Sequence, residues 1–158
     1  MNYPVRIGIV GGGQLGKMLT VAAKKMGFYV VVSDPTPNSP AGQVADYQIV
    51  SDFKDKKGIK ELSKLSDIVT FEVELANSKE LMSLKKKGKI IHPSPKTLEI
   101  IQDKLKQKTF LNKNKIPTAR FFEITTLDDV IKASKILGFP LLLKARTDSY
   151  DGRGNFVI

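Results

Sequence analysis

Residues 5–16 have the sequence VRIGIVGGGQLG, in which a short apolar run leads directly into closely spaced glycines. Such a run is typical of a strand buried on both faces, and glycines permit a tight turn from a strand into a helix. A second apolar run, YVVVSD at residues 29–34, predicts another buried strand. The helix predicted between them, which ends at Gly27, rests on apolar residues at helical spacing, namely Leu15, Met18, Leu19 and Ala22. Together these segments predict a right-handed β-α-β unit.

The same alternation of strands and helices continues to about residue 95. Further strands are predicted at residues 46–50, 67–74 and 89–93, and further helices at residues 59–65 and 81–87. Strands that alternate with helices indicate a doubly wound α/β fold with a parallel sheet. We therefore expect a first, Rossmann-like domain over residues 1–95.

The prolines of HPSPKT, residues 92–97, mark the predicted start of a second region, residues 96–158. A helix is predicted over residues 98–114 and a strand over residues 118–124. A second helix at residues 125–139 has a Thr126/Asp129 capping pair and stops at Gly138. The strands at residues 140–146 and 155–158 flank a glycine turn and predict an antiparallel hairpin. This region is α+β, and because the chain ends within a hairpin arm we expect it to be truncated.

Composition excludes several kinds of site. The 158 residues are 41% hydrophobic and 27% charged, as in ordinary globular proteins, and they contain no cysteine and one histidine. Disulfides, thiolate metal sites and multi-histidine metal sites are therefore excluded. We interpret the single histidine, His92, as an ordinary loop residue. No run is long enough to cross a membrane and no secretory signal is present, so the cytoplasm is the expected location.

The net charge of +10 raises the question of nucleic-acid binding. The basic residues, however, are mostly lysines spread along the chain, and no basic run is interleaved with aromatic residues. We therefore predict a solvated lysine-rich surface and no nucleic-acid or membrane partner. An excess of positive charge also favours an anionic small molecule as substrate.

The hexapeptide GGGQLG, residues 11–16, satisfies the pattern G-x-G-x-x-G. In a strand–turn–helix the glycines let a ligand approach the backbone, and the amino end of the helix attracts an anion. Asp34, at the end of the second strand, stands where nicotinamide-dependent enzymes place the acid that binds a ribose hydroxyl. The turn is therefore compatible with a dinucleotide, with another anionic ligand, or with glycines that serve packing alone.

The stretch LLLKARTDSYDGRGN, residues 141–155, is more informative. Lys144 lies on an otherwise apolar strand, and the turn after it contains two glycines, an arginine and an amide. A strand lysine together with a flexible glycine turn is one way in which enzymes hold the phosphates of ATP. The pattern is not that of a P-loop, and a hairpin with a tolerant turn and no ligand remains the alternative.

The chain resembles the amino-terminal part of the N5-carboxyaminoimidazole ribonucleotide synthetases, ATP-grasp enzymes of purine biosynthesis. It is also similar to the ATPase-like portion of fungal phosphoribosylaminoimidazole carboxylases. The resemblance covers nearly all 158 residues. It rests on segments in the same order and spacing, namely residues 11–18, 34–46, 70–74, 92–111 and 141–158.

The resemblance implies a pre-ATP-grasp domain followed by the first lobe of an ATP-grasp domain, and a fragment that is inactive alone. The implied reaction is ATP-dependent carboxylation of 5-aminoimidazole ribonucleotide by bicarbonate through carboxyphosphate, a carbon–nitrogen ligation. The implied ATP-binding residues are Lys104, Lys144, Ser149, Tyr150, Asp151, Gly152, Arg153, Gly154 and Asn155, of which Lys144 and Tyr150 are also the catalytic candidates. The implied substrate-binding residues are Gly13, Gln14, Leu15 and Glu72. Ligands for Mg²⁺ are expected beyond Ile158, with none in the fragment, and the full-length enzyme is expected to be a homodimer.

The sequence departs from this family at Asp148 and Ser149, where bacterial members commonly have glycines, so the mobility of the loop is open. Three alternatives remain. They are a purine-pathway ATP-grasp ligase that uses formate, a dehydrogenase-like dinucleotide-binding module supported by Asp34, and a non-catalytic remnant that binds nucleotide or a partner. The dehydrogenase alternative assigns no role to Lys144 or to the second glycine turn.

Overall fold

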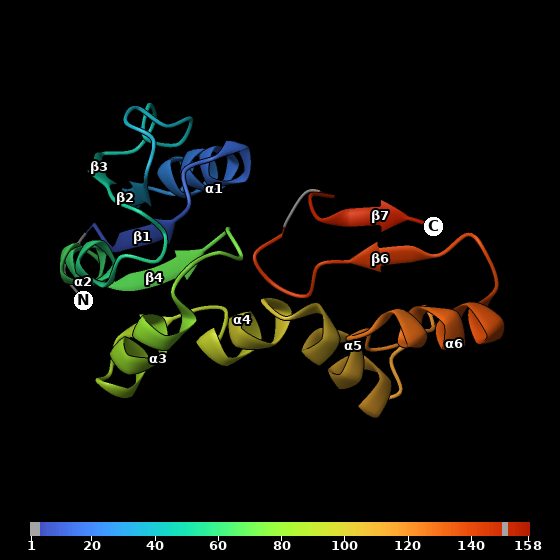
Figure 1. Cartoon of the computed structure of the whole chain (residues 1–158). Coiled ribbons are helices and arrows are strands. Elements are labelled where there is room, and N and C mark those ends of the chain that lie inside the picture. The colour runs from blue at the N-terminus through green and yellow to red at the C-terminus, as the bar shows by residue number, and fades with distance from the viewer. Residues whose placement is uncertain (1–3, 150–151) are drawn as a thin grey trace. The chain divides into compact units, whose positions relative to one another are not determined.

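The computed structural model describes residues 4–149 and 152–158 and divides the chain into two compact units, residues 1–99 and 100–158. The first unit contains a parallel sheet with the strand order β3-β2-β1-β4-β5 (Figure 1). Its strands are β1 (Arg6–Val10), β2 (Tyr29–Asp34), β3 (Tyr47–Val50), β4 (Ile68–Phe71) and β5 (Ile90–Ile91). Its helices are α1 (Gln14–Lys25), α2 (Lys56–Leu65), α3 (Ser78–Lys86) and α4 (Pro95–Ile101), the last of which extends two residues past the division. The predicted doubly wound α/β fold is confirmed.

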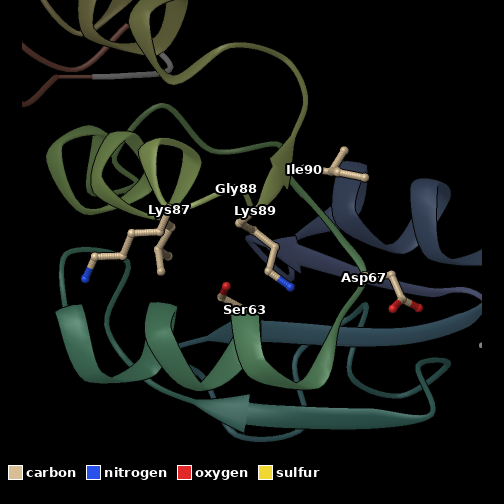
Figure 2. A pocket seen from close by; sticks show the side chains of 7 residues that line it. Ser63, Asp67, Lys87, Gly88, Lys89 and Ile90 are labelled. Atoms are coloured by element: carbon tan, nitrogen blue, oxygen red, sulfur yellow. The ribbon is translucent and has the colours of Figure 1, made fainter. Parts of the chain in front are cut away.

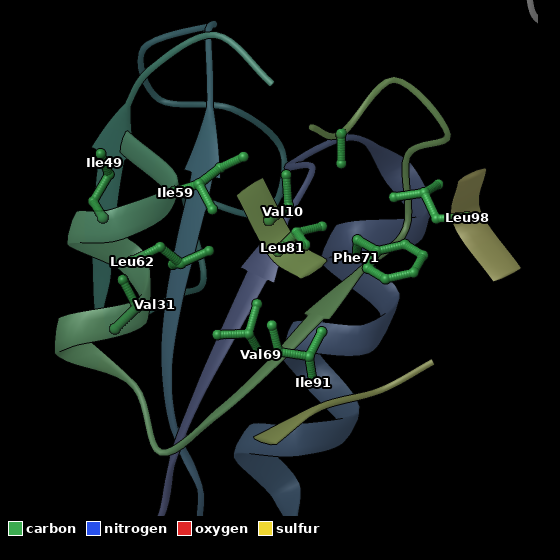
Figure 3. Close-up of a cluster of buried hydrophobic side chains, with 11 residues drawn as sticks. Val10, Val31, Ile49, Ile59, Leu62, Val69, Phe71, Leu81, Ile91 and Leu98 are labelled. Atoms are coloured by element: carbon green, nitrogen blue, oxygen red, sulfur yellow. The ribbon is translucent and has the colours of Figure 1, made fainter. Parts of the chain in front are cut away.

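Both faces of this sheet are covered, which explains why its central strands are continuously apolar. Successive side chains of a strand point to opposite faces, so Val31 packs with one group of buried residues while Val30 and Val32 pack with another. On the face of Val31, α2 contributes Ile59 and Leu62 (Figure 3). This face holds most of the core, with Val10, Ile49, Val69, Phe71, Ala76, Leu81, Ile91 and Leu98 as further members.

Helix α1 packs on the opposite face with its small residues. Its buried positions are Gly16, Thr20 and Ala23, at helical spacing. The large apolar residues whose spacing predicts the helix are not packed against the sheet, since Leu15 and Met18 are each 60% exposed. Helical spacing indicates that a helix forms, but the small residues that permit close packing decide which side of the helix meets the sheet.

Gly16 allows α1 to approach the turn after β1 closely. A Cβ atom built on Gly16 would lie 2.5 Å from the carbonyl oxygen of Gly11. That oxygen belongs to the backbone, and it cannot move without disturbing the strand end. Gly16, the last glycine of the hexapeptide, is therefore required for helix–sheet packing, whatever ligand the turn binds.

The second unit contains α5 (Lys104–Lys113), α6 (Leu127–Leu137), β6 (Leu142–Lys144) and β7 (Asn155–Val157). Strands β6 and β7 pair in antiparallel fashion, so the predicted hairpin is confirmed. The Thr126/Asp129 capping box is present at the start of α6. Hydrogen bonds from the backbone N–H and the hydroxyl of Thr125, and further ones from Thr126, hold the pKa of Asp129 below its ordinary range. Gly138 ends the helix with φ 77°, a conformation that favours glycine.

Two predicted elements of this region are wrong. The helix expected over residues 98–114 is interrupted at Asp103, whose carboxylate accepts hydrogen bonds from the backbone N–H groups of Leu105 and Lys106 and so starts a new helix. The strand expected over residues 118–124 is an irregular segment. Its aromatic and aliphatic residues have the composition of a strand, but no strand among the described residues pairs with it, and a strand exists only with a partner.

Among the residues that the structure describes, no helix combines the length and the apolar character needed to cross a membrane.

Replacing Gly16 with alanine tests the close approach of α1. Helix propensity alone predicts that Gly16→Ala stabilises the protein by about 1 kcal/mol. We expect the clash with the Gly11 carbonyl to dominate and to lower the free energy of unfolding by about 1–3 kcal/mol, measured by urea denaturation. Gly13→Ala is the matched control, because its Cβ would meet nothing closer than 3.6 Å. A Gly16→Ala protein as stable as the parent would contradict this account.

Candidate functional site

The turn after β1 is held between the ends of two neighbouring strands. On the β2 side, the N–H of Gly11 donates to the carbonyl of Ser33 at 2.9 Å, and the N–H of Gly12 donates to a carboxylate oxygen of Asp34 at 2.8 Å. On the β4 side, the N–H of Glu72 donates to the carbonyl of Val10 at 3.0 Å. The turn therefore lies where the chain order of the sheet reverses, which is the usual ligand-binding edge of such folds.

A side chain on Gly11 would occupy the place of the Glu72 carboxylate. Gly11 has φ 106°, which favours glycine, and a Cβ there would lie 2.5 Å from Glu72 Oε1. A Cβ on Gly12 would lie 2.4 Å from the hydroxyl oxygen of Ser39 and 2.8 Å from the Cβ of Asp34. The first two glycines thus make room for polar side chains of the protein itself.

Asp34 is committed to the backbone. One of its oxygens accepts from Gly12 as described, and the other accepts from the N–H of Thr36 at 2.8 Å. The residue is only 6% exposed. The carboxylate that a nicotinamide cofactor would need for its ribose is therefore already bound to backbone N–H groups of the protein.

Glu72 is half-buried beside the same turn. Burial raises the pKa of its carboxyl group, the negative charges of Asp34 and Glu74 raise it further, and a hydrogen bond from the N–H of Gly13 opposes the rise. The predicted substrate-side residues Gly13 and Glu72 are thus in contact, and the side chain carries a perturbed acid.

The amino end of α1 begins at Gly13, which caps the helix without any side-chain hydrogen bond. Gln14 and Leu15 lie in the first turn of the helix, and both are exposed. Helix N–H groups without a side-chain cap are available to an anionic group, as the hexapeptide predicts. The four predicted substrate-side residues therefore cluster at one strand edge of the first unit.

In the second unit, Lys104 contacts the segment that leads into the glycine loop. Its ammonium group donates to the carbonyl of Ser149 at 2.8 Å and to the hydroxyl of Ser149 at 2.7 Å. Ser149 is 8% exposed. The structure thus brings together two predicted ATP-binding residues that are 45 positions apart in the chain.

Lys144 lies opposite Asn155 in the hairpin, and the next residue, Ala145, donates its N–H to the carbonyl of Gly154 at 2.8 Å. The Lys144 side chain is exposed. Gly152 and Gly154 have φ 78° and 71°, so both turn glycines adopt the left-handed conformation. Lys144, Gly154 and Asn155 therefore lie where the two strands of the hairpin meet its loop, and Gly152 lies within that loop.

Other loop residues show how this chain differs from a glycine-rich pattern. Asp148 has φ 53°, the left-handed conformation in which glycine is least strained, at one of the two positions where the resembling family commonly has glycine. Arg153 is exposed. Tyr150 and Asp151 lie outside the described residues.

The motifs of the sequence did not indicate Asp103 and Arg146, which flank this site. Arg146 Nε donates to both carboxylate oxygens of Asp103 at 2.9 Å, and this pairing holds the pKa of Asp103 below its ordinary range. The one available signal was an acid directly before Lys104, because Asp is a preferred residue at a helix start.

A pocket of about 460 Å³ lies at the opposite edge of the first unit, where the strands begin (Figure 2). Its polar lining includes Asp67, Lys87 and Lys89, and the Lys89 ammonium already donates to the carbonyl of Ser66 at 2.6 Å. None of the predicted site residues lines this pocket. This pocket and the predicted site are therefore different places.

Within residues 4–149 and 152–158, no group of three or more acidic or histidine side chains is arranged to hold a metal ion.

Two family models match the chain. Residues 5–102 match the ribonucleotide synthetase preATP-grasp domain, and residues 109–158 match the ATP-grasp domain. Together they include the glycine turn, Glu72 and the hairpin loop.

Individual relatives agree with these models. The chain is 37% identical over 160 aligned residues to the N5-carboxyaminoimidazole ribonucleotide synthase of Staphylococcus epidermidis, and it spans 42% of that protein's length. It is 51% identical to the crystal structure of N5-carboxyaminoimidazole ribonucleotide synthetase from Thermotoga maritima, with a TM-score of 0.85, and covers 41% of that chain with 98% of its own. A further structure, N5-carboxyaminoimidazole synthase from Aspergillus clavatus in complex with ADP and 5-aminoimidazole ribonucleotide, is 35% identical with a TM-score of 0.83. The match covers 97% of this chain and 40% of that one.

The family match over residues 5–102 includes the glycine turn and Glu72, and the chain spans about 42% of the length of its curated relative from Staphylococcus epidermidis. The chain belongs to the ribonucleotide synthetase pre-ATP-grasp family and resembles the amino-terminal part of N5-carboxyaminoimidazole ribonucleotide synthetases.

Proposed function

We propose that this chain forms the substrate-side domain and part of the ATP site of a ligase that carboxylates 5-aminoimidazole ribonucleotide with bicarbonate. ATP is consumed to ADP and phosphate, and the carboxyl group is transferred to the exocyclic amine of the ribonucleotide. The observation that carries the proposal is the contact of Lys104 with Ser149 at the base of the hairpin loop. It places a cation beside the predicted phosphate-binding loop.

Support for the substrates comes from the Aspergillus clavatus relative, which is described with ADP and 5-aminoimidazole ribonucleotide bound. A ribonucleotide carries a phosphate and ribose hydroxyls. The uncapped amino end of α1 suits the anion, and Glu72 suits a hydrogen bond to the amine or to a hydroxyl. In this proposal the glycine turn faces the ribonucleotide, and ATP binds elsewhere.

The residues of the second unit suit the phosphates of ATP. Phosphoryl transfer develops charge on the transferred group, and preorganised cations stabilise that charge most strongly in a site from which water is excluded. We assign this role to Lys104 and Lys144, with Ser149 to Asn155 as the loop that covers the phosphates. A covering loop would also keep water from carboxyphosphate, which otherwise hydrolyses.

Tyr150 is assigned to the place where the two substrates meet, as the family resemblance implies. The Mg²⁺ ligands are expected outside residues 1–158, and no step here is routed through that ion. We propose that the chain of residues 1–158 is inactive alone and that the complete enzyme is homodimeric and cytoplasmic.

A decisive assay measures phosphate release by a polypeptide that carries this chain and extends to the length of its curated relatives. We expect ATP hydrolysis to require both 5-aminoimidazole ribonucleotide and bicarbonate, and formate not to replace bicarbonate. Release that depends on formate would assign the protein to the formate-using ligases. An ATPase that neither acid stimulates would refute the proposal.

Replacing Lys104 with methionine removes the charge and keeps much of the side chain's apolar length. In the extended polypeptide we expect kcat to fall by about 100-fold, the effect of losing one preorganised charge-stabilising group. Lys106→Met, two residues later on the same helix and exposed, is the control and is expected to retain activity. Equal activity of the two variants would remove Lys104 from the site.

Replacing Glu72 with glutamine tests its perturbed acid. Folding raises the Glu72 pKa above its ordinary value of 4.5, so the folded state binds this proton more tightly than the unfolded state does. The free energy of unfolding therefore falls as the pH rises from 4.5 through the raised pKa. Glu72→Gln is expected to flatten this fall, measured by urea denaturation between pH 4 and 8, and to weaken binding of the ribonucleotide. Exposed Glu61→Gln is the control. If the stability profile of Glu72→Gln matches that of the parent, the carboxyl group is not perturbed.

A further inference from the structure

Asp103 makes two kinds of contact at once. It starts α5 by accepting from the N–H groups of Leu105 at 3.0 Å and Lys106 at 3.1 Å. It also receives Arg146 Nε on both carboxylate oxygens, and it is only 9% exposed. An asparagine would serve the first purpose equally well, since Asn and Asp cap helices with similar strength. The negative charge is needed only for the second.

Arg146 connects Asp103 to two further groups. Its NH1 donates to Glu123 Oε1 at 2.8 Å, and its backbone carbonyl accepts the N–H of Lys104 at 2.9 Å. The start of α5 is therefore joined to Arg146 twice, through the side chain of Asp103 and through the backbone of Lys104. Two such links fix both the position and the direction of the helix start.

The Lys104 ammonium bonds with Ser149 complete a closed circuit. Ser149 Oγ in turn donates to the carbonyl of Ala145 at 3.3 Å, beside Arg146. The circuit thus runs from Asp103 to Arg146 through their side chains, and from Arg146 to Ser149 along the backbone. It returns from Ser149 to Lys104, the residue after Asp103, through the ammonium group. It aligns an ammonium group with the start of the hairpin loop.

We propose that Asp103 and Arg146 are positioning residues, which hold Lys104 and the base of the hairpin loop in the geometry that receives a polyphosphate. This inference rests on the proposed function of Lys104 and assigns a role to two residues outside the predicted site. A long lysine side chain loses conformational freedom when it binds an anion, and a prealigned one loses less. The lowered pKa of Asp103 agrees with a carboxylate that stays ionised in this pairing.

Charge and positioning predict opposite effects of Asp103→Asn on anion binding. Removing a negative charge next to Lys104 would strengthen phosphate binding by simple Coulomb attraction. Loss of the Arg146 pairing would weaken it. The sign of the change therefore separates the two effects, and the cap on α5 is kept in both cases.

The test titrates the 158-residue chain with inorganic tripolyphosphate and measures hydrogen exchange at the Lys104 amide. For Asp103→Asn we expect binding to weaken by about 3- to 10-fold and the amide to exchange faster. Arg146→Gln removes the same pairing and is expected to do the same, while Arg146→Lys restores part of both. Asp55→Asn is the matched control, because Asp55 caps the equally long α2 in the same way.

Tripolyphosphate binding by Asp103→Asn that equals or exceeds the parent's, with unchanged exchange at Lys104, would overturn the proposal. If the parent chain binds no tripolyphosphate, the proposed role of Lys104 in ATP binding loses its support. The exchange measurement still decides whether Asp103 and Arg146 hold Lys104 in place.

Discussion

The first unit depends on the fit between a side-chain-free turn and two carboxylates. Asp34 ends β2 and Glu72 follows β4, the strands on either side of β1, and with Ser39 they occupy the space that side chains at Gly11 and Gly12 would fill. Gly16 then lets α1 lie against the carbonyl of Gly11. These contacts determine where the helix begins, and therefore where its free N–H groups point. The chemistry proposed for this edge is a result of that packing.

The same fit changes how a glycine-rich fingerprint should be interpreted. The hexapeptide and Asp34 together match the pattern of a nicotinamide-binding turn, in which the acid faces a ribose. In this protein both oxygens of Asp34 accept backbone N–H groups from within the fold. The acid and the glycines are adapted to each other, so the pattern can arise without a dinucleotide. The acid of the turn that is only half-buried is instead Glu72, which follows a different strand.

The sequence was sufficient to predict the parallel sheet, the capping box of α6 and the hairpin, because each depends on local patterns. It could not show that Leu15 and Met18 face away from the sheet, since that choice depends on the small residues opposite them. It mispredicted residues 118–124 as a strand, because pairing is not a local property. Nor could it reveal the Asp103–Arg146 pairing, whose members are 43 positions apart and belong to no motif.

The glycines of the first turn have a consequence for the evolution of this family. Gly11, Gly12 and Gly16 are required by packing, so a copy of the gene that has lost its activity would still keep them for as long as selection maintains a folded protein. Glu72 is different, since a glutamine of the same size would keep the fit against Gly11, and only a working site would need the carboxyl group with its burial penalty. In a set of diverged sequences, persistence of the glycines would therefore indicate a retained fold, whereas persistence of Glu72 would indicate retained chemistry.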